Sequence, residues 1–128
     1  FDESMKNVYD DCIRPAIVDC GFEALRVDEV LHNDKIDDKI IALIKESRFL
    51  VADITGHRPN VYYEVGFAHG QGKQVIMVCS EEEKNNLHFD IRQYNCIFYN
   101  HSKLDKLKND IEYRIRASIG FNPPKTFV

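Results

Sequence analysis

The segment Phe49–Gly70 constrains the fold of this chain more than any other part of the sequence. It opens with the apolar run Phe49–Ala52 and becomes polar at Asp53. A short loop leads to Asn60, and a helical pattern then continues to His69 before a glycine. This order predicts a buried strand, a loop and a helix N-terminus. In open α/β sheets, ligands bind where strands end and helices begin.

Two carboxylates flank the predicted loop. Asp53 lies at the end of the strand, and Glu64 lies one helical turn beyond Asn60, which we interpret as the helix N-cap. The spacing of four places Asn60 and Glu64 on one helix face. Both carboxylates also have ordinary interpretations. Glu64 is then a surface residue of a first helical turn, and Asp53 caps the turn through backbone amides.

The rest of the chain alternates between helical and strand patterns. Apolar residues at spacings of three and four predict helices, and short apolar runs predict strands. The predicted helices are 4–19, divided or kinked at Pro15, 36–47, and 102–119 with Ser102 as its N-cap, and the further strands are 22–27, 75–79 and 96–99. This alternation predicts a single α/β domain with a parallel sheet and helices on both faces.

Composition excludes several classes of protein. The chain has 128 residues and a net charge of −4, which argues against a nucleic-acid surface. No apolar run approaches the roughly 18 residues of a membrane span. The four cysteines lack metal-ligand spacing, so we expect reduced, buried thiols in a cytoplasmic protein, with no metal and no cofactor.

The first residues are unusual for an α/β domain. The sequence begins at Phe1 without an initiator methionine, and a helical pattern follows almost at once. A domain of this kind usually opens with a strand. We therefore expect residues 1–128 to be a fragment that lacks its first strand.

Residues 52–78, ADITGHRPNVYYEVGFAHGQGKQVIMV, resemble the nucleoside 2-deoxyribosyltransferase-like family, which grades into TIR-like nucleotide-processing domains. The family pattern is a strand ending in Asp, a short loop, Asn-Val-Tyr-Tyr-Glu-Leu-Gly-Tyr-Ala-His, and a strand after a Gly-Lys turn. The matching residues here are Asp53, Asn60, Val61, Tyr62, Tyr63, Glu64, Gly66, Ala68, His69 and Lys73. The resemblance implies a flavodoxin-like, Rossmannoid sheet.

The resemblance also implies a reaction. In transferases of this group the glutamate of this helix attacks the anomeric carbon of a nucleoside and forms a glycosyl-enzyme ester. Glu64 is the corresponding nucleophile, and Asp53 would orient the sugar or assist the leaving base. An ionised nucleophile near a positive helix end suits this chemistry. The family also borrows residues between subunits, so the resemblance implies a homo-oligomer.

Other residues are predicted to contact the ligand. Asn60 would position it together with the helix N-terminus, and one of Tyr62 and Tyr63 would line the pocket. His57 and Arg58 occupy the loop where transferases carry further carboxylates, which suggests a phosphate-bearing ligand. More weakly, Arg26 could read a phosphate and Asp90 could close over the sugar.

Three interpretations of the function remain open at the level of sequence. The first is cleavage or transfer at the N-glycosidic bond of a nucleoside or nucleotide. The second is a TIR-like domain that cleaves NAD as a defence effector, because that chemistry also uses one glutamate near a helix. The third is a sensor that binds a nucleotide without turning it over.

Overall fold

The computed structural model describes residues 7–27, 38–86 and 96–120 of the chain. Strands β1 (Phe49–Asp53), β2 (Gln74–Ser80) and β3 (Ile97–Tyr99) form a parallel sheet in the order β1-β2-β3. The helices are η1 (Tyr9–Ile13), α2 (Arg14–Asp19), α4 (Asp38–Glu46), α5 (Pro59–Gly70), η2 (Glu81–Asn86) and α7 (Leu104–Ser118).

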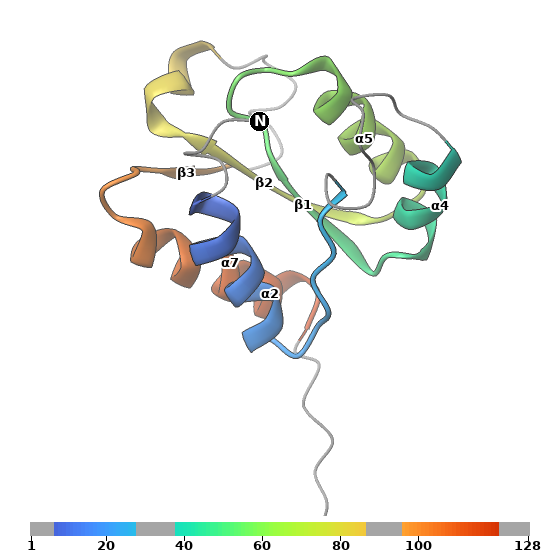
Figure 1. Cartoon of the computed structure of the whole chain (residues 1–128), viewed down its shortest axis with the longest axis horizontal. Coiled ribbons are helices and arrows are strands. Elements are labelled where there is room, and N and C mark those ends of the chain that lie inside the picture. The colour runs from blue at the N-terminus through green and yellow to red at the C-terminus, as the bar shows by residue number, and fades with distance from the viewer. Residues whose placement is uncertain (1–6, 28–37, 87–95, 121–128) are drawn as a thin grey trace, which may run out of the picture.

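Helices cover both faces of the sheet, as Figure 1 shows, with α2 and α7 on one face and α4 and α5 on the other. Alternate residues of β2 separate the two layers of the core. Ile76 and Val78 pack with the buried residues of α2 and α7, whereas Met77 and Cys79 pack toward α5. The structure therefore confirms the predicted α/β, flavodoxin-like fold with helices on both faces.

The register brings polar residues to one edge of the sheet. Asp53 is opposite Val78, and Ser80 is opposite Tyr99 two residues further along β2. Because all three strands are parallel, their carboxyl ends meet at this edge. Thus Asp53 and Tyr99, far apart in sequence, lie close together.

The N-terminal helix, predicted to be kinked or divided at Pro15, is continuous but changes from π-helical to α-helical geometry just before Pro15. A π-helical turn, η1, precedes α2, and the amide of Arg14 donates to Tyr9 O, a spacing of five residues. Pro15 lacks an amide and so cannot continue an α-helical ladder across this point. The prediction of Ser102 as an N-cap is wrong by one residue, since α7 is capped at Lys103. In the described ranges, no helix is long and apolar enough to cross a membrane.

The prediction of a strand over residues 22–27 is wrong. Residues 22–26 belong to no helix or strand, although Phe22 lies edge-on to Phe49 with ring centroids 5.2 Å apart. The alternating pattern is present, but a strand also needs a neighbouring backbone to pair with. None of the described strands pairs with this segment.

All four cysteines are free and buried, as the sequence predicts. Burial raises the pKa of the Cys12 thiol to about 11 and that of Cys96 to about 12. The thiolate is the reactive form of cysteine, so these groups are poor nucleophiles at neutral pH. Both side chains pack in the hydrophobic core.

Candidate functional site

The helix that follows the loop after β1, α5, begins one residue earlier than its predicted N-cap at Asn60. Pro59 is the first residue of the helix and Arg58 is the N-cap, with φ −69° and ψ 128° and no side-chain capping hydrogen bond. The prediction of Asn60 as N-cap is therefore wrong, because Asn60 lies inside the first turn. Proline favours the first helical position and forces an extended backbone on the residue before it.

This shift of the helix start changes the electrostatics at Glu64. Glu64 now lies in the second turn of α5 rather than at the end of the first. The helix dipole acts mainly within the first turn, so it stabilises the Glu64 carboxylate less than the sequence suggests. Arg58, at the N-cap, places a positive side chain at the same helix end.

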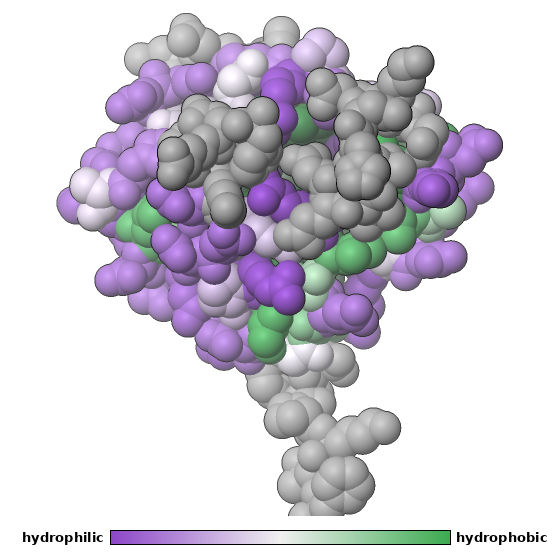
Figure 2. Space-filling model, viewed as in Figure 1, coloured by the Kyte–Doolittle hydropathy of each residue, from purple (hydrophilic) through white to green (hydrophobic). Residues whose placement is uncertain are grey.

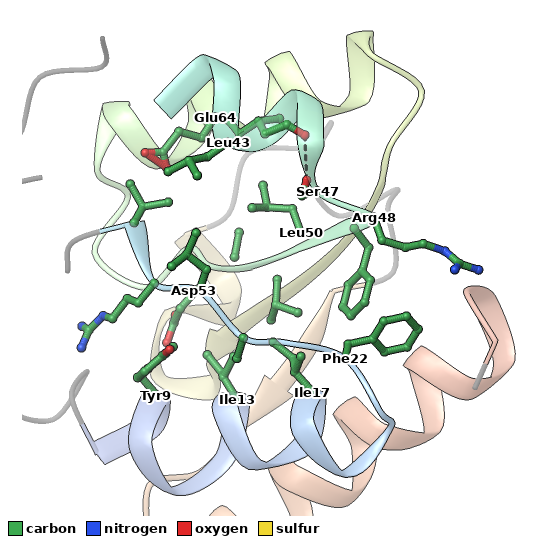
Figure 3. A pocket seen from close by; sticks show the side chains of 18 of the residues that line it. Tyr9, Ile13, Ile17, Phe22, Leu43, Ser47, Arg48, Leu50, Asp53 and Glu64 are labelled. Carbon is green, nitrogen blue, oxygen red and sulfur yellow. Dashed lines mark hydrogen bonds between the residues drawn. The ribbon is translucent and has the colours of Figure 1, made fainter. Parts of the chain in front are cut away.

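A groove of about 520 Å³ runs along β1. Its walls come from η1, α2, residues 22–27, α4, β1 and the start of α5. At the carboxyl end of β1 the lining is polar and charged: Tyr9, Arg26, Asp53, Arg58 and Glu64. Figure 3 shows Glu64 on one side and Tyr9 on the other, with Asp53 beside Tyr9. We call this polar end the candidate site.

Asp53 is held rigidly by two neighbours. One carboxylate oxygen accepts the Thr55 amide at 2.9 Å, and the other accepts the Tyr99 hydroxyl at 2.7 Å. Thr55 is itself fixed, because its hydroxyl accepts the Ser80 amide at 2.8 Å. Burial raises the pKa of Asp53 above its usual value, and the hydrogen bonds from Thr55 and Tyr99 oppose this effect.

The raised pKa of Asp53 predicts how stability changes with pH. The folded chain holds the Asp53 proton to a higher pH than the unfolded chain, in which the pKa is about 3.9. The stability gained from the protonated form is present below about pH 4 and is lost as pH rises through the folded pKa. Urea unfolding of the native chain and Asp53→Asn across this range should show a native-minus-variant difference that falls with pH. A flat difference would contradict the prediction.

Tyr9 and Arg26 form the opposite wall of the site. The guanidinium of Arg26 lies 4.7 Å from the centroid of the Tyr9 ring, a cation–π geometry. The Tyr9 hydroxyl accepts a 3.4 Å hydrogen bond from Arg14. Sequence analysis placed Tyr9 only within the predicted helix 4–19. In the structure Tyr9 lies at the start of η1, and the start of this helix lies near the carboxyl edge of the sheet. This position is the signal that could have identified Tyr9 as a site residue.

Four other predicted contact residues lie outside the lining of the groove. These are Asn60, Tyr62, Tyr63 and His57. His57 adopts the left-handed φ of 53°, and its Nδ1 is 2.7 Å from the Tyr62 hydroxyl. Its Nε2 lies 3.4 Å from a carboxylate oxygen of Glu83, which accepts the Gly56 amide at 2.8 Å. The His57 ring therefore ties the loop to η2. Asp90 lies outside the described residues.

His57 should accordingly be structural. Asparagine tolerates a positive φ, so His57→Asn removes the ring contacts without adding backbone strain. We expect the free energy of unfolding to fall by about 1 kcal/mol, because the hydrogen bond with Tyr62 and the contact with Glu83 are lost. The affinity for a nucleotide, measured by calorimetry, should change less than about twofold. A tenfold loss of affinity would place His57 in the site.

Among the described residues, no group of three or more His, Cys, Asp or Glu side chains is arranged to hold a metal ion. What the candidate site does contain is a pair of carboxylates, of Asp53 and Glu64, and a pair of guanidinium groups, of Arg26 and Arg58. Chemically, such a site can supply a nucleophile, an acid or base, and charge-assisted hydrogen bonds to an anion.

Comparison with solved structures finds a similar fold in a CMP N-glycosidase, BcmB, from Clostridium botulinum. The two structures align with a TM-score of 0.57 and 24% sequence identity, over 84% of this chain and 92% of that chain. At this identity the likeness shows the fold alone. No protein-family model matches the chain, and no curated protein matches it.

Proposed function

We propose that this chain cleaves the N-glycosidic bond of a nucleoside or nucleotide, with Glu64 as the nucleophile. The observation that carries the proposal is the convergence of Glu64 and Asp53, with two arginines, at the polar end of one groove. The likeness of the fold to a CMP N-glycosidase supports the same reaction class.

The proposed reaction has two steps. A carboxylate oxygen of Glu64 forms a bond to C1′ of the sugar while the bond from C1′ to the base nitrogen breaks, and the base leaves with the bonding electrons and takes up a proton. Water then attacks C1′ and gives up one proton, which restores the group that protonated the base. The Glu64 carboxylate is released, so that the configuration is retained. If a second base attacks instead of water, the same intermediate gives transfer.

Asp53 would act beside the nucleophile. Its carboxyl group is held in place by Thr55 and Tyr99, and burial raises its pKa. A carboxyl group with a raised pKa can donate a proton to a leaving base, and its ionised form can accept hydrogen bonds from sugar hydroxyls. Either role requires the fixed geometry that the two hydrogen bonds provide.

Arg58 and Arg26 favour a phosphate-bearing substrate. Arg58 is exposed at the N-terminus of α5, where backbone amides also attract anions. Arg26 is positioned over Tyr9 on the opposite wall. Together they would bind a 5′-phosphate while the sugar lies over Asp53 and Glu64. A nucleoside monophosphate is therefore the substrate class that we infer.

Arg58→Ala should weaken the use of nucleotides as substrates much more than the use of nucleosides. A charge-assisted hydrogen bond contributes about 1.5–3 kcal/mol, so KM for a nucleoside monophosphate should rise roughly 10- to 100-fold. KM for the matching nucleoside should stay within about twofold. Arg48→Ala is the matched control, because Arg48 lines the same groove but lies over Phe22, at the start of β1. Equal losses for both substrates would contradict phosphate recognition.

Base release, followed by chromatography, tests the proposal directly. The panel holds nucleosides and deoxynucleosides, their monophosphates, and NAD, each with the native chain and Glu64→Gln. Free base from a nucleoside or its phosphate, lost in the variant, is the expected result. Release of nicotinamide alone would favour the TIR-like NAD reaction. Tight binding without any base release would replace the enzyme with a nucleotide sensor.

A further inference from the structure

The short helix η2, directly after β2, is strongly acidic. Its sequence is Glu-Glu-Glu-Lys-Asn-Asn, with three glutamates in the first turn. Figure 2 shows the described surface of one face of the molecule as mainly hydrophilic, so a run of charge has an ordinary interpretation as a solvated surface. That interpretation fits Glu82, which is exposed. It does not account for Glu81 and Glu83, because the carboxylates of both bind neighbouring loops.

Glu83 reaches back to the loop between β1 and α5. Its Oε2 accepts the Gly56 amide at 2.8 Å and lies 3.4 Å from Nε2 of His57. The Glu83 side chain is only 28% exposed, although it belongs to a polar surface helix. One carboxylate oxygen thus contacts two consecutive residues of the loop.

The backbone that Glu83 binds has an uncommon conformation. Gly56 and His57 both have a positive φ, of 89° and 53°. Glycine adopts such angles freely, whereas a residue with a Cβ is strained in the left-handed region. His57 therefore keeps this conformation because its surroundings hold it, and Glu83 and Tyr62 are among those surroundings. Without Glu83 the loop should relax to other backbone conformations.

The same loop holds one of the two donors to Asp53. The Thr55 amide donates to one carboxylate oxygen, and the Tyr99 hydroxyl donates to the other. η2 is joined to the chain beside each donor. Glu83 binds the residue after Thr55, and Glu81 accepts a 3.0 Å hydrogen bond from Asn100, the residue after Tyr99. η2 therefore bridges the two loops on which the geometry of Asp53 depends.

We propose that Glu83 is a positioning residue for the candidate site. It holds the loop of residues 54–58 from outside the groove, so that Thr55 stays against Asp53 and Arg58 stays at the start of α5. Glu83 is not part of the groove lining, so it acts through the loop and not on the ligand. Its importance for catalysis rests on the proposed function, whereas its effect on Asp53 does not.

The direction of change in the pKa of Asp53 distinguishes positioning from a simple effect of charge. Hydrogen bonds from Thr55 and Tyr99 lower this pKa, because they stabilise the ionised carboxylate. If Glu83→Ala releases the loop, the Thr55 amide moves away and the pKa of Asp53 rises. If Glu83 acts only through its negative charge, removing that charge lowers the pKa of Asp53. The two effects have opposite signs.

Carboxyl carbon-13 NMR titration measures this pKa, with Asp53→Asn to assign the resonance. The pKa of Asp53 should rise in Glu83→Ala. It should not rise in Glu83→Gln, because the glutamine amide oxygen still accepts the Gly56 amide. Glu82→Ala is the matched control, since it removes the same charge from an exposed position of the same helix. An unchanged or lower pKa in Glu83→Ala would overturn the proposal, and so would an equal rise in Glu82→Ala.

Hydrogen exchange at single amides provides a second measurement and also reports folding. In Glu83→Ala, exchange of the Thr55 amide should speed up at least roughly 10-fold, because a released loop opens more often. The Ile54 amide donates to Val78 O at 2.9 Å, so its exchange should stay slow and shows that the sheet is intact. Unchanged exchange at Thr55 would contradict the proposal even if activity had fallen.

Kinetics connect this position to the proposed reaction. Glu83→Ala should lower kcat/KM for a nucleoside monophosphate about 10-fold or more, because Asp53 and Arg58 lose their fixed places, and Glu83→Gln should restore most of the loss. If the native chain releases no base, the proposed function fails, while the NMR measurements still decide whether Glu83 positions Asp53. If Glu83→Ala moves the pKa of Asp53 but leaves kcat/KM of an active chain unchanged, the catalytic part of the proposal is overturned.

Discussion

Glu64→Gln should abolish base release while leaving the fold and nucleotide binding intact. The substitution preserves the shape of the side chain and removes only its ionised, nucleophilic form. Loss of a covalent nucleophile typically lowers kcat by at least about 1,000-fold, and often far more. Glu64 is half-buried on α5 and lines the polar end of the groove, so no neighbouring side chain of α5 can substitute for it there. Single-turnover release of base from a nucleoside monophosphate measures the effect.

Glu46→Gln is the matched control for this experiment. Glu46 lines the same groove, but it is the last residue of α4 and lies next to the start of β1. Its loss should leave kcat within about twofold, because a surface substitution far from the chemistry has little effect. A second readout is a trapped glycosyl ester on Glu64, detected by mass spectrometry of the quenched native chain. If Glu64→Gln retains most of its activity, another group must be the nucleophile.

The general architecture could be predicted from the sequence because the signals are local. Apolar runs identified the three strands that lie in the described residues, and helical spacing identified α4, α5 and α7. The strand–loop–helix order then placed Asp53 and Glu64 at one edge of a parallel sheet. The strand–loop–helix order and the positions of the two carboxylates depend only on spacing between residues close in sequence. Both are present in the structure.

The details that failed depend on competition between local rules. Asparagine favours N-cap positions, but Pro59 one residue earlier determines where α5 begins. Residues 22–27 alternate like a strand, but a strand forms only beside a partner. Tyr99 and Tyr9 could not be assigned to the site, because their positions depend on the pairing of distant segments. The contacts of His57 with Tyr62 and Glu83 depend on the same long-range arrangement, and its predicted contact with a ligand stays a prediction.

Asp53 could stabilise the fold, act on the substrate, or do both. Two substitutions distinguish these roles. In Asp53→Asn the amide oxygen still accepts the Thr55 amide, so the free energy of unfolding near pH 5 should fall by only about 1 kcal/mol. Activity should fall by about 100-fold or more, because the neutral amide can neither ionise nor donate a proton to a leaving base.

Tyr99→Phe removes the other partner and leaves the carboxylate in place. Tyr99 is 3% exposed and its hydroxyl donates to Asp53, so stability should fall by about 1–2 kcal/mol. Because this hydrogen bond lowers the pKa of Asp53, its loss should raise that pKa further. The pH profile of kcat/KM should therefore move to higher pH while its maximum falls less than about tenfold.

The pattern across the two variants decides the role of Asp53. If Asp53 acts on the substrate, Asp53→Asn will be much less active than Tyr99→Phe although it is the more stable of the two. If Asp53 only holds the turn at Thr55, activity will follow stability, and Tyr99→Phe will be the more damaged variant. Kinetics and urea unfolding of both proteins, at matched pH, measure the two quantities independently. Only the first pattern is compatible with the proposed reaction.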